Sequence, residues 1–169
     1  MKKLFINNNV KLYGAIGGLA VLLNMIIALI NEPAVFFGET VNHIWLILYV
    51  TPVHFILFEL TIPFIRLRWK RLLIAPFLLF GHLLLLTLGI YAWRSIGIGL
   101  HIYTEYKKYE HIEDGLENFT GFSVGTLFFF GILRHIYHYR KLKLAAQQLR
   151  IEKQEAELNY LKSQTNPHF

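Results

Sequence analysis

Cysteine is absent from this chain of 169 residues, and charged residues are scarce. Without cysteine the chain forms no disulfide and supports no thiolate chemistry, although this leaves its compartment undecided. Charged residues make up only 17% of the sequence, whereas 54% is apolar and 15% is aromatic. Together with a mean hydropathy of +0.41, this composition indicates a membrane protein rather than a soluble domain.

Four apolar stretches each reach roughly the 20 residues that a bilayer requires. They cover residues 10–30, 41–65, 72–93 and 119–139, and each holds few charges. The first follows Met1-Lys-Lys and imitates a signal peptide, but it is longer than a typical signal core and lacks a clear A-x-A site, so we interpret it as a retained span. The predicted fold is all-α, with a four-span transmembrane domain over residues 1–139.

Basic residues predict which side of the membrane each end of the chain occupies. Of the 17 Lys and Arg, 14 lie near the N-terminus, between the second and third spans, or in the fourth span and the tail. Only Arg94, Lys107 and Lys108 fall on the other side. By the positive-inside rule both termini are cytoplasmic, and we expect a multi-pass protein of the bacterial inner (plasma) membrane. The net charge of +6 is then mainly a topology signal, and no nucleic-acid partner is expected.

The second outer loop, residues 94–118, is the only sizeable feature expected outside the cytoplasm. Within it Ile102, Tyr106 and Tyr109 fall near helical spacing, which predicts a short amphipathic helix on the bilayer surface that ends at Asp114-Gly115. Such a helix is either a lid or sensor element or an aromatic anchor at the interface.

The polar tail from residue 140 to residue 164 has the composition of a continuous helix, because it is rich in Lys, Glu, Gln, Leu and Ala and free of Gly and Pro. We expect it to extend the fourth span without a break. Two apolar stripes run along it on nearly opposite faces, one through Leu144, Ile151 and Leu158 and the other through Leu142 and Leu149. They predict either a parallel coiled coil in a homodimer or a helix buried on two sides.

The end of the tail carries a motif, Leu161-Lys-Ser-Gln-Thr-Asn-Pro-His-Phe169. It resembles the phosphoacceptor box of the LytS/YehU-type sensor histidine kinases, which runs approximately L-K-x-Q-x-N-P-H-F and continues L-F-N. The resemblance implies that His168 accepts a phosphoryl group from ATP and that Gln164, Asn166 and Pro167 belong to the box. Residues 140–169 would then be the cytoplasmic signalling helix ending in the start of the phosphoacceptor region.

The same resemblance implies the partners of such a kinase. ATP and Mg would be bound by a catalytic domain that these residues do not include, so we expect no kinase activity from this chain alone and no cofactor bound to it. A response regulator of the LytTR type would receive the phosphoryl group from His168.

Four ionisable residues lie inside the predicted spans, where they are costly and are candidates for function. His54 and His82 fall near the centres of their spans and could meet, while Glu59 and Arg134 fall at a similar depth and could pair. They form either a sensor of protons, metal or a quinone-like molecule, or neutral hydrogen-bonding residues and a structural ion pair. Because two histidines make a poor metal site without a third ligand, no metal is predicted.

Two other classes of function remain open from the sequence. A small four-helix membrane protein could bind or transport a ligand and oligomerise through its tail. A cofactor-binding electron-transfer protein could instead use the intramembrane histidines.

Overall fold

The computed structural model describes residues 2–66, 69–109 and 111–165, and these are helical over most of their length, without a β-strand. Four helical stretches meet the length and apolarity needed to cross a membrane, as the sequence predicts. In chain order the helical elements are α1 (Lys2–Asn31), η1 (Pro33–Val35), α2 (Phe36–Ile56), η2 (Leu57–Thr61), α3 (Ile62–Arg66), η3 (Trp69–Ile74), α4 (Ala75–Gly99) and α5 (Ile112–Thr165).

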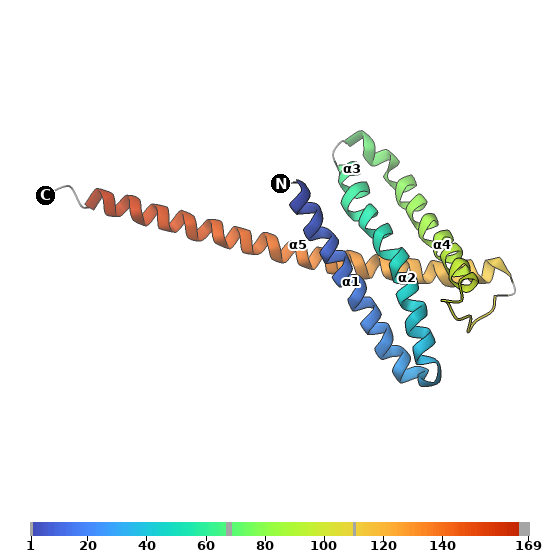
Figure 1. Cartoon of the computed structure of the whole chain (residues 1–169). Coiled ribbons are helices and arrows are strands. Elements are labelled where there is room, and N and C mark those ends of the chain that lie inside the picture. Colours follow the sequence, from blue (N-terminus) through green and yellow to red (C-terminus); the bar gives the residue numbers. More distant parts are fainter. Residues whose placement is uncertain (1, 67–68, 110, 166–169) are drawn as a thin grey trace. The chain divides into compact units, whose positions relative to one another are not determined.

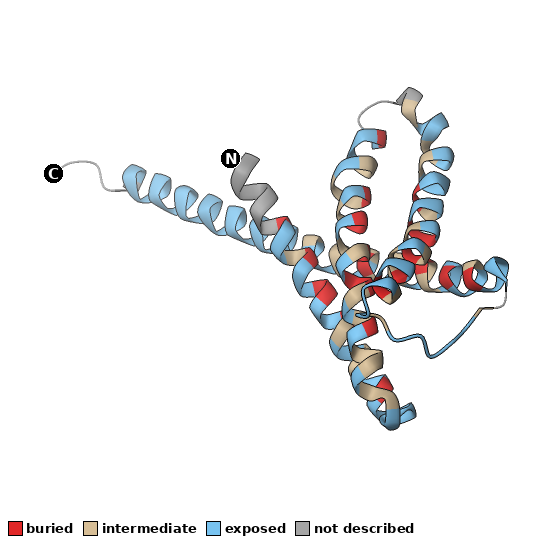
Figure 2. Cartoon of the chain, turned by 45° about the vertical axis from the view of Figure 1, so that its right-hand side comes forward, coloured by how far each residue is buried: buried red, intermediate tan, exposed pale blue. Residues whose placement is uncertain are grey.

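The chain is divided into two compact units, Met1–Gly131 and Ile132–Phe169. In the first unit α1 and α2 lie side by side and antiparallel, joined by the short turn η1, and α2 also packs against α4 (Figure 1). Buried positions occur on these helices and on the part of α5 in this unit (Figure 2). The largest fully buried side chains include Tyr13 of α1, Leu57 of η2, Leu86 of α4 and Phe130 of α5. Many large apolar side chains on the outward faces stay exposed, as is expected of helices that meet lipid.

Two tryptophans join α2 to α4. The indole Nε1–H of Trp45 donates to the carbonyl of Trp93 at 2.9 Å, and that of Trp93 donates back to the carbonyl of Trp45 at 2.8 Å. Their rings stack with centroids 4.6 Å apart. This reciprocal pair fixes the register of the two helices beside the outer loop.

The second span is interrupted, although its sequence reads as one apolar run. Pro52 lies inside α2 and cannot donate a backbone hydrogen bond, and five residues later the backbone widens into the π-helical turn η2, which contains Glu59. π-turns of this kind occur most often as single insertions in an α-helix and are frequent at functional sites.

The prediction of an amphipathic helix in the second outer loop is wrong. Residues 100–109 lack helical structure, α5 begins at Ile112, and Asp114-Gly115 lies in its first turn rather than ending a helix. His101 adopts a φ of 60°, which an α-helix does not tolerate. The loop therefore follows tertiary contacts instead of its own apolar spacing.

Those contacts come from α2 and α4. The side-chain amide of Asn42 donates to the carbonyl of Thr104 and accepts from its N–H, both at 2.8 Å. The buried Arg94 donates to Glu105 Oε1 at 2.7 Å and to the carbonyl of Lys107 at 2.9 Å. These bonds hold the loop backbone in a non-helical conformation and so compete successfully with helix formation.

Tyrosine side chains complete the packing around Arg94. Its guanidinium carbon lies 5.5 Å from the ring centroid of Tyr103 and 5.1 Å from that of Tyr109. Burial raises the pKa of both phenols, and the nearby Arg94 charge offsets part of that effect. Both tyrosines therefore stay neutral around a single guanidinium cation near neutral pH.

The second unit is the later part of α5, which continues without interruption to Thr165. This confirms the prediction of an unbroken helix after the fourth span. The residues from 139 to 164 are all exposed, including the leucines of both apolar stripes. The composition explains the helix, because the segment contains strong helix formers and no Gly or Pro.

Candidate functional site

The last four residues of the predicted phosphoacceptor box lie beyond the described part of the chain. Asn166, Pro167 and His168 lie outside the described residues, so their roles stay predictions. Gln164 is described, and its Nε2 donates to the hydroxyl of Tyr160 at 2.7 Å. Ser163 Oγ donates to the carbonyl of Tyr160 at 2.7 Å, so the last described turn of α5 is tightly bonded.

His54 and His82 do come together in the first unit. Their ring centroids are 6.1 Å apart, and 0% of His54 and 7% of His82 is exposed. Phe130 of α5 covers His54 with its centroid 4.7 Å away and stacks on Tyr13 of α1. Counting residues from the centre of each span therefore predicted this contact correctly.

A chain of hydroxyl groups links His54 to α4 and α5. Thr87 Oγ1 donates to Ser123 Oγ at 3.3 Å, Thr126 Oγ1 donates to the carbonyl of Ser123 at 3.1 Å, and His54 Nε2 lies 3.2 Å from Thr126 Oγ1. Because Thr126 uses its only proton on Ser123, His54 Nε2 must carry the hydrogen in its bond to Thr126. Nδ1 of His54 is then an acceptor.

Two ring nitrogens of this centre are buried without a hydrogen-bond partner among the described residues, namely His54 Nδ1 and His82 Nε2. A buried polar atom without a partner costs about 1 to 3 kcal/mol. A small polar molecule that hydrogen-bonds to either nitrogen would remove this cost. Within the described part of the chain, no three His, Cys, Asp or Glu residues gather to hold a metal.

Glu59 is held by residues that the sequence did not single out. Asn9 Nδ2 donates to Glu59 Oε2 at 2.7 Å, and the Tyr13 hydroxyl donates to Oε1 at 3.1 Å. Both donors belong to α1, so this carboxylate joins the first and second spans across the π-turn. Arg134 belongs to the second unit, and its pairing with Glu59 stays a prediction.

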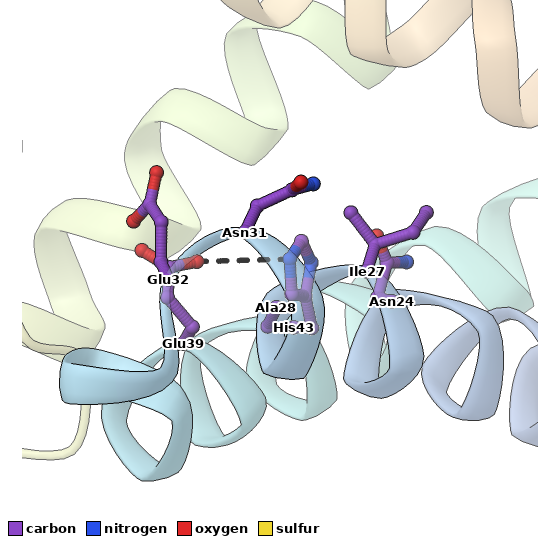
Figure 3. Close-up of a pocket in the computed structure, with 7 residues that line it drawn as sticks. All are labelled: Asn24, Ile27, Ala28, Asn31, Glu32, Glu39 and His43. Atoms are coloured by element: carbon purple, nitrogen blue, oxygen red, sulfur yellow. Dashed lines mark ion pairs between the residues drawn. The ribbon is translucent and has the colours of Figure 1, made fainter.

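A polar cavity of about 150 Å³ lies at the turn between α1 and α2 and was not predicted from the sequence (Figure 3). Asn24, Ile27, Ala28 and Asn31 of α1 line it together with Glu32, Glu39 and His43. Glu39 Oε2 and His43 Nε2 are 3.7 Å apart, and Nδ1 of His43 is buried without a hydrogen-bond partner among the described residues. The only sequence feature that could have indicated this cavity is the i, i+4 spacing of Glu39 and His43, which places both side chains on one face of a helix.

Comparisons of this chain with protein-family models, with curated proteins and with solved structures find no match.

Replacing Thr126 by Val is expected to destabilise the first unit by about 0.5 to 1.5 kcal/mol, because His54 Nε2–H loses its acceptor. The free energy of unfolding of the purified chain in detergent measures the effect. Thr120→Val is the matched control, since Thr120 lies on the same helix and bonds only the carbonyl of Leu116 one turn earlier. An equal loss in both variants would contradict a specific role for the Thr126 bond.

Proposed function

We propose that this chain is the membrane-sensor and signal-transmitting part of a two-component sensor histidine kinase, with His168 as its phosphoacceptor. The observation that carries the proposal is α5, a single helix from Ile112 to Thr165. It includes both the fourth apolar stretch and the polar tail, and it reaches the residue just before Asn166-Pro167-His168.

The tail supports a homodimeric arrangement of this kind. Leu142 is 71% exposed and Leu144 66% exposed, and the same stripes continue through Leu149, Ile151 and Leu158. A solvated helix with two rows of exposed leucines is unfavourable alone. A second copy of the same helix, paired through residues 140–164, would cover one stripe and hold two His168 residues near each other.

The proposed topology follows from the basic residues. Both termini would lie in the cytoplasm of a bacterium, with α1 to α4 and the first part of α5 in the inner membrane. An input at the outer loop or inside the bundle would shift α5, and the tail would change how His168 is presented. A LytTR-type response regulator would be the partner that receives the signal.

The chemistry asked of His168 is a phosphoryl transfer. A neutral ring nitrogen would attack the γ-phosphorus in line, so that an N–P bond forms as the bond to the ADP oxygen breaks. Gln164 and Asn166 are the nearby groups that could orient the other ring nitrogen. By the resemblance, a separate ATP-binding domain would hold the nucleotide and Mg.

Mixing experiments with radiolabelled ATP test this proposal. The purified chain in lipid nanodiscs should take up no label from [γ-³²P]ATP alone, and should gain an acid-labile phosphoryl group when the ATP-binding domain of a LytS/YehU-type kinase is added. Labelling by ATP alone, or no labelling with several such domains, would contradict the proposal.

A second candidate function is a small four-helix membrane protein that binds or transports a ligand, and the polar cavity between α1 and α2 favours it. Under this alternative, ligand binding would survive removal of residues 158–169 and the chain would never become phosphorylated. The mixing experiment therefore separates the two candidates.

A further inference from the structure

The polar cavity at the turn between α1 and α2 adjoins a second, apolar cavity. The second has a volume of about 240 Å³ and is lined by side chains of α1, α2 and α5, including Leu23, Ile47, Phe122 and Phe129. The two cavities share Asn24 and Ile27. We call these two adjacent cavities together the groove, with a polar end and an apolar end, and each of them is smaller than the roughly 300 Å³ at which ligand pockets begin.

The polar end of the groove carries excess negative charge. Glu32 and Glu39 line it, while residues 12–65 contain no Lys or Arg. The cations of the second outer loop are used elsewhere, since Arg94 pairs with Glu105 and both Lys107 and Lys108 line a different cavity. Two carboxylates without a Lys or Arg beside them favour a cation between them, and His43 balances Glu39 only if its ring is protonated.

The uncharged polar groups at this end are also arranged to accept hydrogen bonds. Asn24 Nδ2 donates to the carbonyl of Ala20 at 2.9 Å, which leaves Asn24 Oδ1 as an acceptor. His43 Nδ1 is buried without a partner among the described residues, and it accepts a hydrogen bond when Nε2, which lies 3.7 Å from Glu39 Oε2, carries the ring proton. A primary ammonium group, which has three N–H donors and no acceptor, complements these groups and the carboxylates together.

We propose that this groove binds a single-chain amphiphile with a net positive, primary ammonium head group. The head lies between Glu32 and Glu39, and the alkyl chain passes Asn24 and Ile27 into the apolar end. From Asn31 to Ala20 the groove follows α1 for about 16 Å, which suits an extended chain better than a compact amine. A phosphate-bearing lipid head group is disfavoured because no Lys or Arg lines either cavity.

The apolar end includes four positions of α5, Phe122, Gly125, Thr126 and Phe129, and α5 is the helix that continues into the tail. An occupant would therefore contact the element that carries the proposed signal. The interpretation of the amphiphile as a stimulus rests on the proposed function, whereas its binding does not.

Photo-crosslinking tests the binding directly. The full chain in phosphatidylcholine nanodiscs is titrated with dodecylamine bearing a diazirine at the far end of its chain, and crosslinked peptides are mapped by mass spectrometry. We expect saturable crosslinking to the peptides that contain Leu23, Phe122 or Phe129. Excess unlabelled dodecylamine should compete, whereas dodecanol and lyso-phosphatidylethanolamine should compete at least about tenfold less well, equal to about 1.4 kcal/mol.

Two variants test the two ends of the groove. Glu39→Gln should weaken saturable binding about tenfold through loss of charge, and Gly125→Leu should abolish it, since an added side chain there meets open space and fills the cavity. Glu113→Gln and Gly81→Leu are matched controls outside the groove, and binding by them should equal that of the unmodified chain.

Equal competition by dodecanol would overturn the role of charge, and equal competition by the lysolipid would identify a lipid head-group site instead. If crosslinking does not saturate, or if neither groove variant changes it, the proposal that the groove is the binding site is wrong. Because neither ATP nor His168 takes part, failure of this test leaves the proposed kinase function untouched, and failure of the phosphorylation test leaves the binding result intact.

Discussion

His168→Gln is expected to abolish labelling of the chain by an added ATP-binding domain. Glutamine keeps a polar side chain near the volume of imidazole but has no ring nitrogen whose lone pair can attack the γ-phosphorus. Because the N–P bond is the only product measured, loss of that nitrogen removes the reaction rather than slowing it. Acid-labile ³²P on the purified chain, followed over time, measures the result.

His111→Gln is the matched control, because His111 is exposed and precedes the first residue of α5. Its labelling should equal that of the unmodified chain. If the His168 variant is still labelled, and the label maps to another histidine, the assignment of the phosphoacceptor is wrong. If label is acid-stable in both variants, the modified group is not a histidine at all.

The sequence predicted the helices well because their cause is local. Apolar runs of sufficient length predicted the four long helical stretches, and the absence of Gly and Pro in the tail predicted the continuity of α5. The contact between His54 and His82 was also predictable, since residues near the centres of two neighbouring apolar stretches fall at one level when the helices pack side by side. Their 6.1 Å separation confirms that contact.

The features that the sequence did not reveal depend on contacts between distant residues. The outer loop has apolar spacing typical of a helix, but Asn42 and Arg94 provide bonds to its extended form. The sequence singled out Glu59 but not Asn9 and Tyr13 of α1, whose neutral side chains donate to its carboxylate. No local pattern identifies such partners, because they are distant in the sequence. Asn42 lies 62 residues from Thr104, and Asn9 and Tyr13 lie 50 and 46 residues from Glu59.

The groove was missed for a related reason. Residues 31–40 are too short to suggest more than a connection, and Glu32 and Glu39 gain significance only when α1 and α2 fold back on each other. Its apolar end needs three helices at once. A site that is assembled from side chains on α1, α2 and α5 has no signature along any one of them.

Ala146→Pro is expected to break the tail helix and to lower phosphorylation of His168 strongly. Proline at this exposed position removes one backbone N–H and clashes with the carbonyl of Leu142, at a cost of about 3 kcal/mol. That is roughly a 100-fold shift against the intact helix. Since the proposed dimer is formed by the same residues, crosslinking between two tails should fall together with the labelling rate.

Ala146→Ser provides the control, because serine keeps the backbone N–H and costs the helix only a few tenths of a kcal/mol. Helix content from circular dichroism, tail crosslinking and labelling by the added ATP-binding domain are measured on the same preparations. If the proline variant loses helix but keeps both crosslinking and labelling, the tail is only a tether and does not transmit a signal. Loss of all three in the proline variant alone would instead show that presentation of His168 depends on an unbroken α5, as a mechanical route from the membrane requires.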